Sequence, residues 1–374
     1  MTYDWERRKL GEIITEYKET VDSDCTLPIL TSSKTEGVIL QEEHFGRKQQ
    51  HDITGYNILP RNYCTYRNRS DGVDFTFNIN KCCDKGIISK FYPVFSGNNS
   101  DVFFLSLVLN NSEEVVHEIA YTCTGTGQKV LSFLDLQKMR VRVPSFEEQK
   151  KVGEIITTLD HLITLHQRQC ENAKKLKKFM LQKMFPKKNQ KNPEIRFAGF
   201  TNDWERRKLG GIASSFEYGL NAAAKEYDGE NKYIRITDID DNTHKFLTDN
   251  LTSPDIDLTG ADNYKLTEGD ILFARTGASV GKTYIYRNSD GLVYYAGFLI
   301  RARIKEEYDA EFVFQNTLTD RYNQYIAVTS QRSGQPGVNA QEYAEFEINV
   351  PKKEEQTKIG TYFRNIDHLI TLHQ

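Results

Sequence analysis

A glycine-rich segment that ends in lysine and threonine, GASVGKT at Gly277–Thr283, contains residue types that bind phosphate. A phosphate-binding loop needs four residues between its glycines, so that backbone N–H groups surround the anion, and a helix after it. This segment has three residues between its glycines, Thr276 stands where the first glycine is required, and the next stretch, TYIYRNSDG, is typical of a strand and a turn. We therefore predict a hairpin turn that presents polar side chains to a polyanion, namely Arg275, Thr276, Ser279 and Lys282.

Other patterns of catalytic or metal-binding residues are missing from the sequence. It contains no H-E-x-x-H and no C-x-x-C. The histidine pairs His161/His166 and His368/His373 are five residues apart, which places their side chains on different faces of a helix. The acidic run at 238–241 is typical of a solvated turn. We predict that this chain has no active site and binds no metal or cofactor.

Composition and charge indicate a soluble globular protein of two or three domains. The chain has 374 residues, of which 38% are hydrophobic and 27% are charged, with a formal net charge of -3. No apolar run is long enough to span a bilayer, and the first residues lack the apolar stretch of a secretory signal, so we expect a cytoplasmic protein. Because the chain is not basic overall, any nucleic acid would have to be recognised by a local patch.

Two repeats define the organisation of the chain. The octapeptide DWERRKLG stands at Asp4–Gly11 and again at Asp203–Gly210. The octapeptide DHLITLHQ stands at Asp160–Gln167 and again at Asp367–Gln374. Most of the sequence between the repeats differs, so the chain is a tandem duplication of a common frame around two variable regions.

A helix is predicted to close each half. Val143-Pro144 and Val350-Pro351 each end an extended segment, because proline lacks the N–H that a strand interior donates. Ser145 and the glutamate three residues later have the spacing of a capping box, so the first helix is expected to begin near Phe146.

The first helix is expected to be long and to pack against the second. Apolar residues recur at heptad spacing from Val152 onward, which is typical of helix–helix packing. The second helix matches only the first part of this pattern. Antiparallel packing of the two is therefore expected to leave Leu176, Phe179 and Met180 uncovered.

The variable regions have the pattern of a mixed α/β (α+β) fold. Short aromatic and β-branched stretches such as GDILFAR and KTYIYRN are typical of strands, and residues 101–109 and 310–325 are expected to be helical. The predicted organisation is a first variable domain at 1–145, a spacer helix with linker at 146–190, a second variable domain at 191–350, and a short second helix at 351–374.

Together these features resemble the specificity subunits of type I restriction-modification systems. The resemblance rests on the DWERRKLG octapeptides, on GDILFARTGASVGKTY, on the Val-Pro-x-x-Glu-Glu-Gln that leads into each helix, and on the bridge LQKMFPKKNQKNPEIRFAGFTNDW. It implies two target-recognition domains separated by long antiparallel coiled-coil helices in a pseudo-two-fold tandem repeat. It further implies double-stranded DNA as a ligand, a bipartite asymmetric recognition site, and no catalysis by this chain.

The resemblance also implies partner subunits. Two methyltransferase subunits and a set of restriction/translocase subunits are expected, with S-adenosylmethionine and ATP/Mg bound on those partners and no membrane association. In such a frame we expect Trp5 and Trp204 of the repeated octapeptide to be packing anchors.

Candidate DNA contacts are chosen by side-chain chemistry. Arginine and glutamine donate bidentate hydrogen bonds to base edges, whereas lysine, serine and threonine suit phosphates. In the first variable region the predicted contacts are Thr31, Ser32, Ser33, Lys34, Arg67, Arg69 and Gln128. In the second they are Arg235, Thr237, Arg275, Thr276, Lys282 and Gln335. Two other classes stay open at this point: a coiled-coil structural adaptor with two protein-binding domains, and a nucleotide-dependent enzyme that uses Gly277–Thr283.

Overall fold

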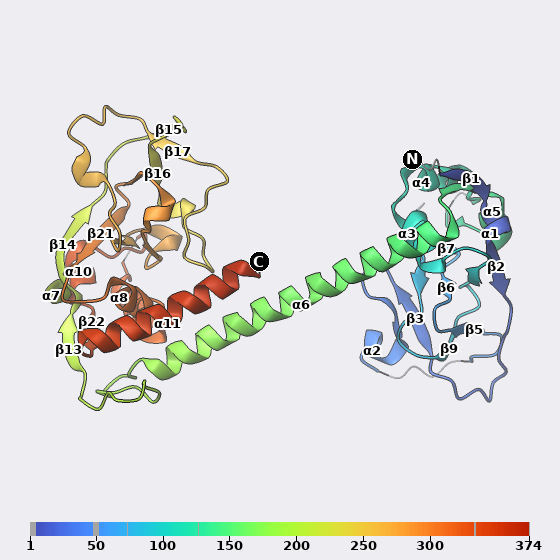
Figure 1. Cartoon of the computed structure of the whole chain (residues 1–374), viewed down its shortest axis with the longest axis horizontal. Helices are drawn as coiled ribbons and strands as arrows, with labels where there is room; N and C mark the ends of the chain where they lie inside the picture. Colours follow the sequence, from blue (N-terminus) through green and yellow to red (C-terminus); the bar gives the residue numbers. More distant parts are fainter. Residues whose placement is uncertain (1–4, 48–51, 73, 126, 333, 374) are drawn as a thin grey trace. The chain divides into compact units, whose positions relative to one another are not determined.

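The computed structural model describes residues 5–47, 52–72, 74–125, 127–332 and 334–373. The chain divides into two compact units, Met1–Ile163 and Thr164–Gln374. Each unit contains both helices and strands, so the predicted mixed α/β (α+β) class is confirmed (Figure 1). The division falls inside one helix, α6 (Phe146–Met184), which belongs to both units.

The first unit is built around a four-stranded sheet with the order β2-β10-β6-β8. Its strands are β1 (Glu6–Lys9), β2 (Ile14–Tyr17), β3 (Leu30–Ser33), β4 (Gly37–Leu40), β5 (Asn57–Pro60), β6 (Cys64–Thr65), β7 (Arg69–Ser70), β8 (Asn78–Ile79), β9 (Lys85–Ile88), β10 (Val94–Gly97), β11 (Lys129–Val130) and β12 (Arg140–Val143). Its other helices are α1 (Leu10–Ile13), α2 (Gln41–Phe45), α3 (Val102–Asn111), α4 (Glu113–Thr122) and α5 (Phe133–Lys138).

The second unit repeats this plan around a sheet with the order β14-β21-β18-β19. Its strands are β13 (Glu205–Lys208), β14 (Ala213–Tyr218), β15 (Ala224–Glu226), β16 (Lys232–Ile234), β17 (Thr252–Pro254), β18 (Ile271–Ala274), β19 (Thr283–Ile285), β20 (Val293–Tyr295), β21 (Leu299–Ile304) and β22 (Glu347–Val350). Its α-helices are α7 (Leu209–Ile212), α8 (Ala310–Asn316), α9 (Asp320–Thr329), α10 (Ala340–Glu345) and α11 (Lys353–Leu372), with short 3-10 turns η1 (Ile236–Asp238), η2 (Asp262–Tyr264), η3 (Gly277–Ser279) and η4 (Asn288–Asp290).

The repeated octapeptide forms the same structure in both units. Strand β1 pairs antiparallel with β12, with Glu6 opposite Val143, and β13 pairs with β22 in the equivalent register, with Glu205 opposite Val350. The leucine directly after each strand is buried. The frame therefore holds the start of each unit beside the strand that leads into its closing helix. Asp4 lies outside the described residues.

The two tryptophans of the octapeptide pack differently. Trp204 is 3% exposed and meets the Phe312 ring edge-on, with ring centroids 5.7 Å apart. Trp5 meets Phe104 in the same edge-on manner at 5.6 Å but is 43% exposed. Both side chains contact core aromatics, as expected of packing anchors, although only Trp204 is buried.

Three of the four helices expected with stated bounds form close to the predicted positions. Helix α6 begins at Phe146, α3 (Val102–Asn111) overlaps the expected segment 101–109, and α11 (Lys353–Leu372) lies within the expected 351–374. The single helix expected at 310–325 is wrong, because the structure has two helices there, α8 and α9. The Thr319 hydroxyl accepts a hydrogen bond from the Tyr322 N–H and so caps α9, which separates the two helices.

A buried glutamine joins each closing helix to its unit. Gln149 in α6 donates from Nε2 to the Pro144 carbonyl at 3.0 Å, and its Oε1 accepts from the Ser100 hydroxyl at 2.6 Å and from the Asp101 N–H at 3.0 Å. Gln356 in α11 donates to the Pro351 carbonyl at 2.8 Å and accepts from the Asp309 N–H at 3.0 Å. Each glutamine is 2% exposed. We call this pair of equivalent contacts the glutamine clamp.

A glycine one turn further along allows each helix to approach its unit closely. A Cβ built on Gly360 would lie 2.6 Å from Asp309 Oδ1 and 2.9 Å from Glu311 Cβ. A Cβ on the equivalent Gly153 would lie 3.3 Å from the Phe103 ring. The Glu-Glu-Gln motif and its glycine therefore fix the contact of α6 with α3 and of α11 with α8.

Replacing Gln356 with alanine is expected to lower the free energy of unfolding of the second unit by about 2–3 kcal/mol, because the Asp309 N–H and the Pro351 carbonyl lose their buried partner. The chain has two tryptophans, one in each unit, so a Trp5→Phe background lets Trp204 fluorescence report the second unit alone. Gln169→Ala, at an exposed position of α6, is the control, with an expected change below about 0.5 kcal/mol. Equal losses in both variants would contradict a role for the clamp.

Helices α6 and α11 pack antiparallel within the second unit. His166 contacts His373 at 2.9 Å between their Nδ1 atoms, and Lys177 forms an ion pair with Asp367 at 2.6 Å. Further along, the Phe185 ring lies 5.7 Å from that of Phe363. As residue numbers rise along α6 they fall along α11, which confirms the predicted antiparallel packing.

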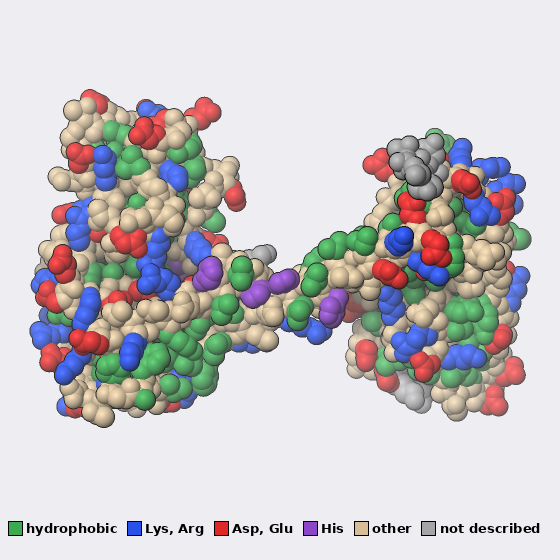
Figure 2. All heavy atoms as spheres, viewed as in Figure 1, with side chains coloured by type: hydrophobic (Ala, Val, Ile, Leu, Met, Phe, Trp, Pro, Cys, Tyr) green, Lys and Arg blue, Asp and Glu red, His purple; other side chains and the backbone are tan. Residues whose placement is uncertain are grey.

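The exposed part of the apolar stripe differs from the expectation. Leu176 and Phe179 are 45% and 49% exposed, but Met180 packs against the core of the second unit, so for this residue the prediction was wrong. The N-terminal part of α6 is also exposed, and Figure 2 shows apolar side chains along its surface. The exposed large apolar residues between the start of α6 and Leu165 are Phe146, Ile155, Leu159, Leu162, Ile163 and Leu165. Among the helices within the described residues, none is long and apolar enough to cross a membrane.

Candidate nucleic-acid interface

Polar residues of the first unit meet at a groove beside the β3–β4 hairpin. The groove has a volume of about 420 Å³. Four of the predicted contacts line it, from two separate segments of the chain: Ser32 and Lys34 from one, Arg67 and Arg69 from the other. Packing of distant segments has therefore brought together side chains that sequence reasoning selected separately.

The hairpin turn holds Lys34 at the edge of this groove. Ser33 Oγ accepts hydrogen bonds from the backbone N–H groups of Thr35 and Glu36, both at 3.3 Å, which closes the turn. Asn78 Nδ2 donates to Ser32 Oγ and to the Ser33 carbonyl, both at 2.8 Å. Lys34 itself forms an exposed ion pair with Asp74. Thr31, which directly precedes Ser32 in β3, lies opposite Ile39 of β4.

The arginines and the Gly-Gln loop of the first unit lie at the same edge. The Arg69 guanidinium lies 4.5 Å from the centre of the Phe91 ring, a cation–π contact that holds it in place. Arg67 is exposed. Strand β11, directly after Gln128, pairs with β7, so that Lys129 lies opposite Ser70 and Val130 opposite Arg69. Gln128 is thus next to the strand that carries Arg69.

In the second unit two glycine-containing loops meet around Arg275. The Gly277 N–H donates to the Pro336 carbonyl at 3.0 Å, and the Val338 N–H donates to the Arg275 carbonyl at 2.9 Å. Thr276 pairs with Gly337, and a Cβ on Gly277 would lie 2.8 Å from Gln335 Nε2. Three predicted contacts, Arg275, Thr276 and Gln335, therefore belong to one surface.

Aromatic side chains that sequence reasoning did not select border this surface. The Arg275 guanidinium lies 5.0 Å from the centre of the Tyr218 ring, and Tyr218 is 44% exposed. Phe298, whose carbonyl accepts from the Arg275 N–H at 3.0 Å, is 59% exposed. No local sequence signal marks either residue, because their position depends on how β21 pairs with β14 on one side and β18 on the other.

The turn after β18 has the predicted hairpin form. Strands β18 and β19 pair antiparallel with Phe273 opposite Thr283, and η3 lies in the loop between them. The chain therefore enters a strand where a phosphate-binding loop would require a helix. The nucleotide-dependent alternative has no support from this geometry.

The other predicted residues of the second unit are engaged in internal contacts. Arg235 donates to both carboxylate oxygens of Asp238 at 2.8 Å, and this hydrogen bonding raises the pKa of the arginine. Thr237 donates to Asp238 Oδ1 at 3.1 Å. Lys282 is 11% exposed, donates to the Ile239 carbonyl at 2.9 Å and pairs with Asp241 at 2.5 Å. In this structure Lys282 secures the 239–241 loop.

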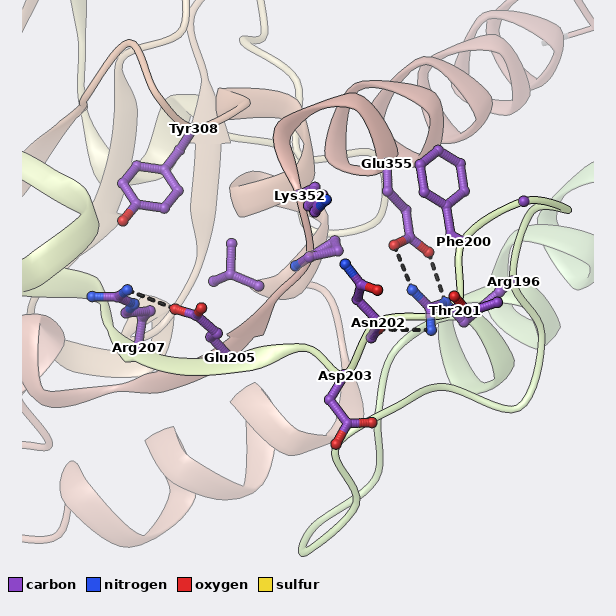
Figure 3. A pocket seen from close by; sticks show the side chains of 13 residues that line it. Arg196, Phe200, Thr201, Asn202, Asp203, Glu205, Arg207, Tyr308, Lys352 and Glu355 are labelled. Atoms are coloured by element: carbon purple, nitrogen blue, oxygen red, sulfur yellow. Dashed lines mark hydrogen bonds and ion pairs between the residues drawn. The ribbon is translucent and has the colours of Figure 1, made fainter.

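A separate pocket of about 520 Å³ lies where the bridge segment meets α11 (Figure 3). Arg196 of the bridge donates to both carboxylate oxygens of Glu355, at 2.9 Å and 2.7 Å, and Glu355 is 1% exposed. This hydrogen bonding raises the pKa of Arg196. On the opposite wall Arg207 pairs with Glu205 at 2.6 Å. Because these charges are matched within the pocket, we interpret it as a structural junction.

A common frame that occurs twice and carries two different polar loop surfaces defines a tandem recognition protein. The family model described as the type I restriction modification DNA specificity domain matches residues 3–175 and again residues 201–374. The chain therefore belongs to this family, with two copies of the domain, and the predicted resemblance is confirmed.

Two known specificity subunits are similar to this chain in sequence. The type I restriction enzyme MjaVIII specificity subunit of Methanocaldococcus jannaschii is 24% identical over 261 residues, which are 66% of this chain and 60% of that protein. The match thus spans less than two thirds of that relative. The putative MjaX specificity subunit of the same organism is 33% identical over 89 residues, 22% of this chain and 20% of its own length.

Solved structures include a chain of the same fold. The S subunit of a type I restriction-modification system from M. genitalium has a TM-score of 0.59 at 12% sequence identity, and the alignment covers 100% of this chain and 91% of that one. At this identity the similarity concerns the fold.

Proposed function

We propose that this chain is the DNA-recognition subunit of a type I restriction-modification complex and recognises a bipartite asymmetric site in double-stranded DNA. In this proposal residues 1–145 and 191–350 each contact one half of the site, and the helices within 146–190 and 351–374 set the distance between the halves. Two methyltransferase subunits, and restriction/translocase subunits, would supply the chemistry with S-adenosylmethionine and ATP/Mg.

One observation carries this proposal. The frame strands pair in the same register in both units, and the glutamine clamp recurs at equivalent positions, whereas the loops that carry the polar side chains differ. Identical frames suit identical partner subunits, and different loops suit different DNA sequences. Half-sites separated by a defined distance are the usual target of paired DNA-binding modules.

The predicted DNA contacts differ in how freely they meet a duplex. Lys34, Arg67, Arg69 and Gln128 lie at one edge of the first unit, and Arg275, Thr276 and Gln335 lie together in the second. We propose that these residues contact bases and phosphates directly. Thr31, Ser32 and Ser33 support the hairpin of Lys34, and Arg235, Thr237 and Lys282 hold the 235–241 segment in position.

Exchange of one variable region is expected to change one half of the methylated sequence. Residues 14–139 would be replaced by the equivalent region of a relative, which leaves β1, α1 up to Ile13, and β12 intact as the frame. Methylome sequencing of cells with the wild-type gene, with the chimera and without the gene reports the motif. We expect a new first half with the second half retained. A change in both halves would contradict independent recognition, and an unchanged methylome after gene deletion would favour a structural adaptor.

A further inference from the structure

A trough in the second unit lies between α6, the end of α11 and the loop 240–247. Its volume is about 750 Å³. Lysines enter it from two sides: Lys174, Lys177 and Lys178 from α6, and Lys245 from the loop. The spacing of the three helical lysines places them on one face of α6. The remaining polar lining comes from Asn242, Thr243, His244 and Thr371, with carboxylates at Asp240 and Asp367.

The helical wall of this trough is strongly basic. Between Arg168 and Lys183, α6 carries six basic residues and one acidic residue, Glu171. Lys177 pairs with Asp367 at 2.6 Å and Lys174 with Glu171 at 3.4 Å. For Lys178 and Lys245 no carboxylate partner occurs among the residues that the structure describes, and Lys245 donates to the Thr371 hydroxyl. Two ammonium groups are therefore available to an external anion.

The acidic groups of the trough are engaged within the protein. Asp367 is neutralised by Lys177. Asp240 accepts from the Asn242 N–H at 3.1 Å and from the N–H and hydroxyl of Thr243, both at 2.7 Å. The hydroxyl bond from Thr243 is the largest cause of the lowered pKa of Asp240, so this carboxylate stays ionised while it closes its own turn.

The loop wall is held rigidly against the recognition sheet. His244 has a positive φ of 56°, and its Nδ1 lies 2.9 Å from the Thr283 carbonyl of β19. Burial lowers the pKa of His244, which keeps its imidazole neutral near pH 7. Lys282 secures the same loop through the Ile239 carbonyl. The position of Lys245 is thus set by the strand that comes after Arg275 and Thr276.

We propose that this trough binds the sugar–phosphate backbone of duplex DNA beside the half-site that the second unit recognises. The inference rests on the proposed function and extends it to a sequence-independent contact. The lining offers ammonium, amide and hydroxyl donors, and lysine binds phosphate as a point charge without reading bases. The trough lies beside the recognition loops of this unit, because His244 is held at the Thr283 carbonyl of β19, the strand that follows the loop of Arg275 and Thr276.

The test is the salt dependence of DNA binding by the full chain carrying Lys178→Gln and Lys245→Gln. A fluorescent duplex of random sequence, about 40 base pairs long, would be titrated at several salt concentrations and followed by anisotropy. Two lost phosphate contacts should reduce the slope of log K against log salt by about 1.8 and weaken binding roughly 50-fold at about 0.1 M salt. The control variant carries Lys175→Gln and Lys188→Gln. These two lysines are exposed and lie outside the trough, so the control makes the same change in net charge.

The outcomes separate the inference from the proposed function. A reduced slope in the trough variant with a nearly unchanged slope in the control supports the trough. Equal reductions in both variants, or wild-type binding by the trough variant, would overturn it while leaving DNA recognition intact. Failure of the wild-type chain to bind any duplex would instead count against the proposed function.

Discussion

Replacing Arg196 with alanine is expected to lower the free energy of unfolding of the second unit by about 3–5 kcal/mol. The change leaves the Glu355 carboxylate, 1% exposed, without the two hydrogen bonds that the guanidinium donates. Loss of one partner of a buried ion pair is costly because the remaining charge stays in a poorly solvated site. Arg196 also stacks near the Trp204 ring, with 5.9 Å to its centre, so packing is lost as well.

Denaturant unfolding in the Trp5→Phe background measures this effect, since Trp204 is then the remaining tryptophan. Arg207→Ala is the matched control, because Arg207 lines the same pocket but forms an exposed pair with Glu205. The denaturant concentration at the unfolding midpoint of the Arg207→Ala variant should stay close to that of the parent protein. Combining Arg196→Met with Glu355→Leu removes both charges and should restore much of the free energy of unfolding that Arg196→Ala loses. A loss below about 1 kcal/mol for Arg196→Ala would show that the junction is held mainly by its other contacts.

Inserting four helix-forming residues after Leu165 is expected to lengthen the gap in the recognised DNA motif or to abolish methylation. The insertion adds about 6 Å to α6 and rotates the C-terminal part of the helix by roughly 40° relative to its N-terminal part. It lies immediately before His166, whose contact with His373 belongs to the packing of α6 on α11, so the fold of the second unit should be retained. The methylated motif in cells, determined by sequencing, reports the result.

The control places the same four residues after Lys188, in the non-helical bridge beyond the end of α6. This insertion lengthens the chain without lengthening the helix, so the gap should stay as it is. If the insertion after Leu165 left both the gap and the methylation activity unchanged, the helix would not set the distance between the half-sites.

The sequence alone determined the features that depend on neighbouring residues or on direct repetition. The duplicated octapeptides define the frame, and the Val-Pro pair with Ser145 and Glu148 after it correctly places the start of α6 at Phe146. The glycine spacing at Gly277–Thr283 correctly excludes a phosphate-binding loop, because that requirement is local. These signals act over a few residues, within the range of turn chemistry, capping and helical periodicity.

Tertiary structure alone decided which polar side chains are available to a ligand. Lys34 and Lys282 are the same residue type, yet Lys34 lies at an open groove and Lys282 is 11% exposed against Asp241. Arg196 has no distinguishing feature in the linker sequence until the fold brings Glu355 beside it. The lysines at 174, 177 and 178 form a plain basic helical face until the 240–247 loop makes them one wall of a trough. The reason is physical: an ion pair or a groove depends on distances between segments far apart in the chain, and the strand pairing that sets those distances leaves no local pattern.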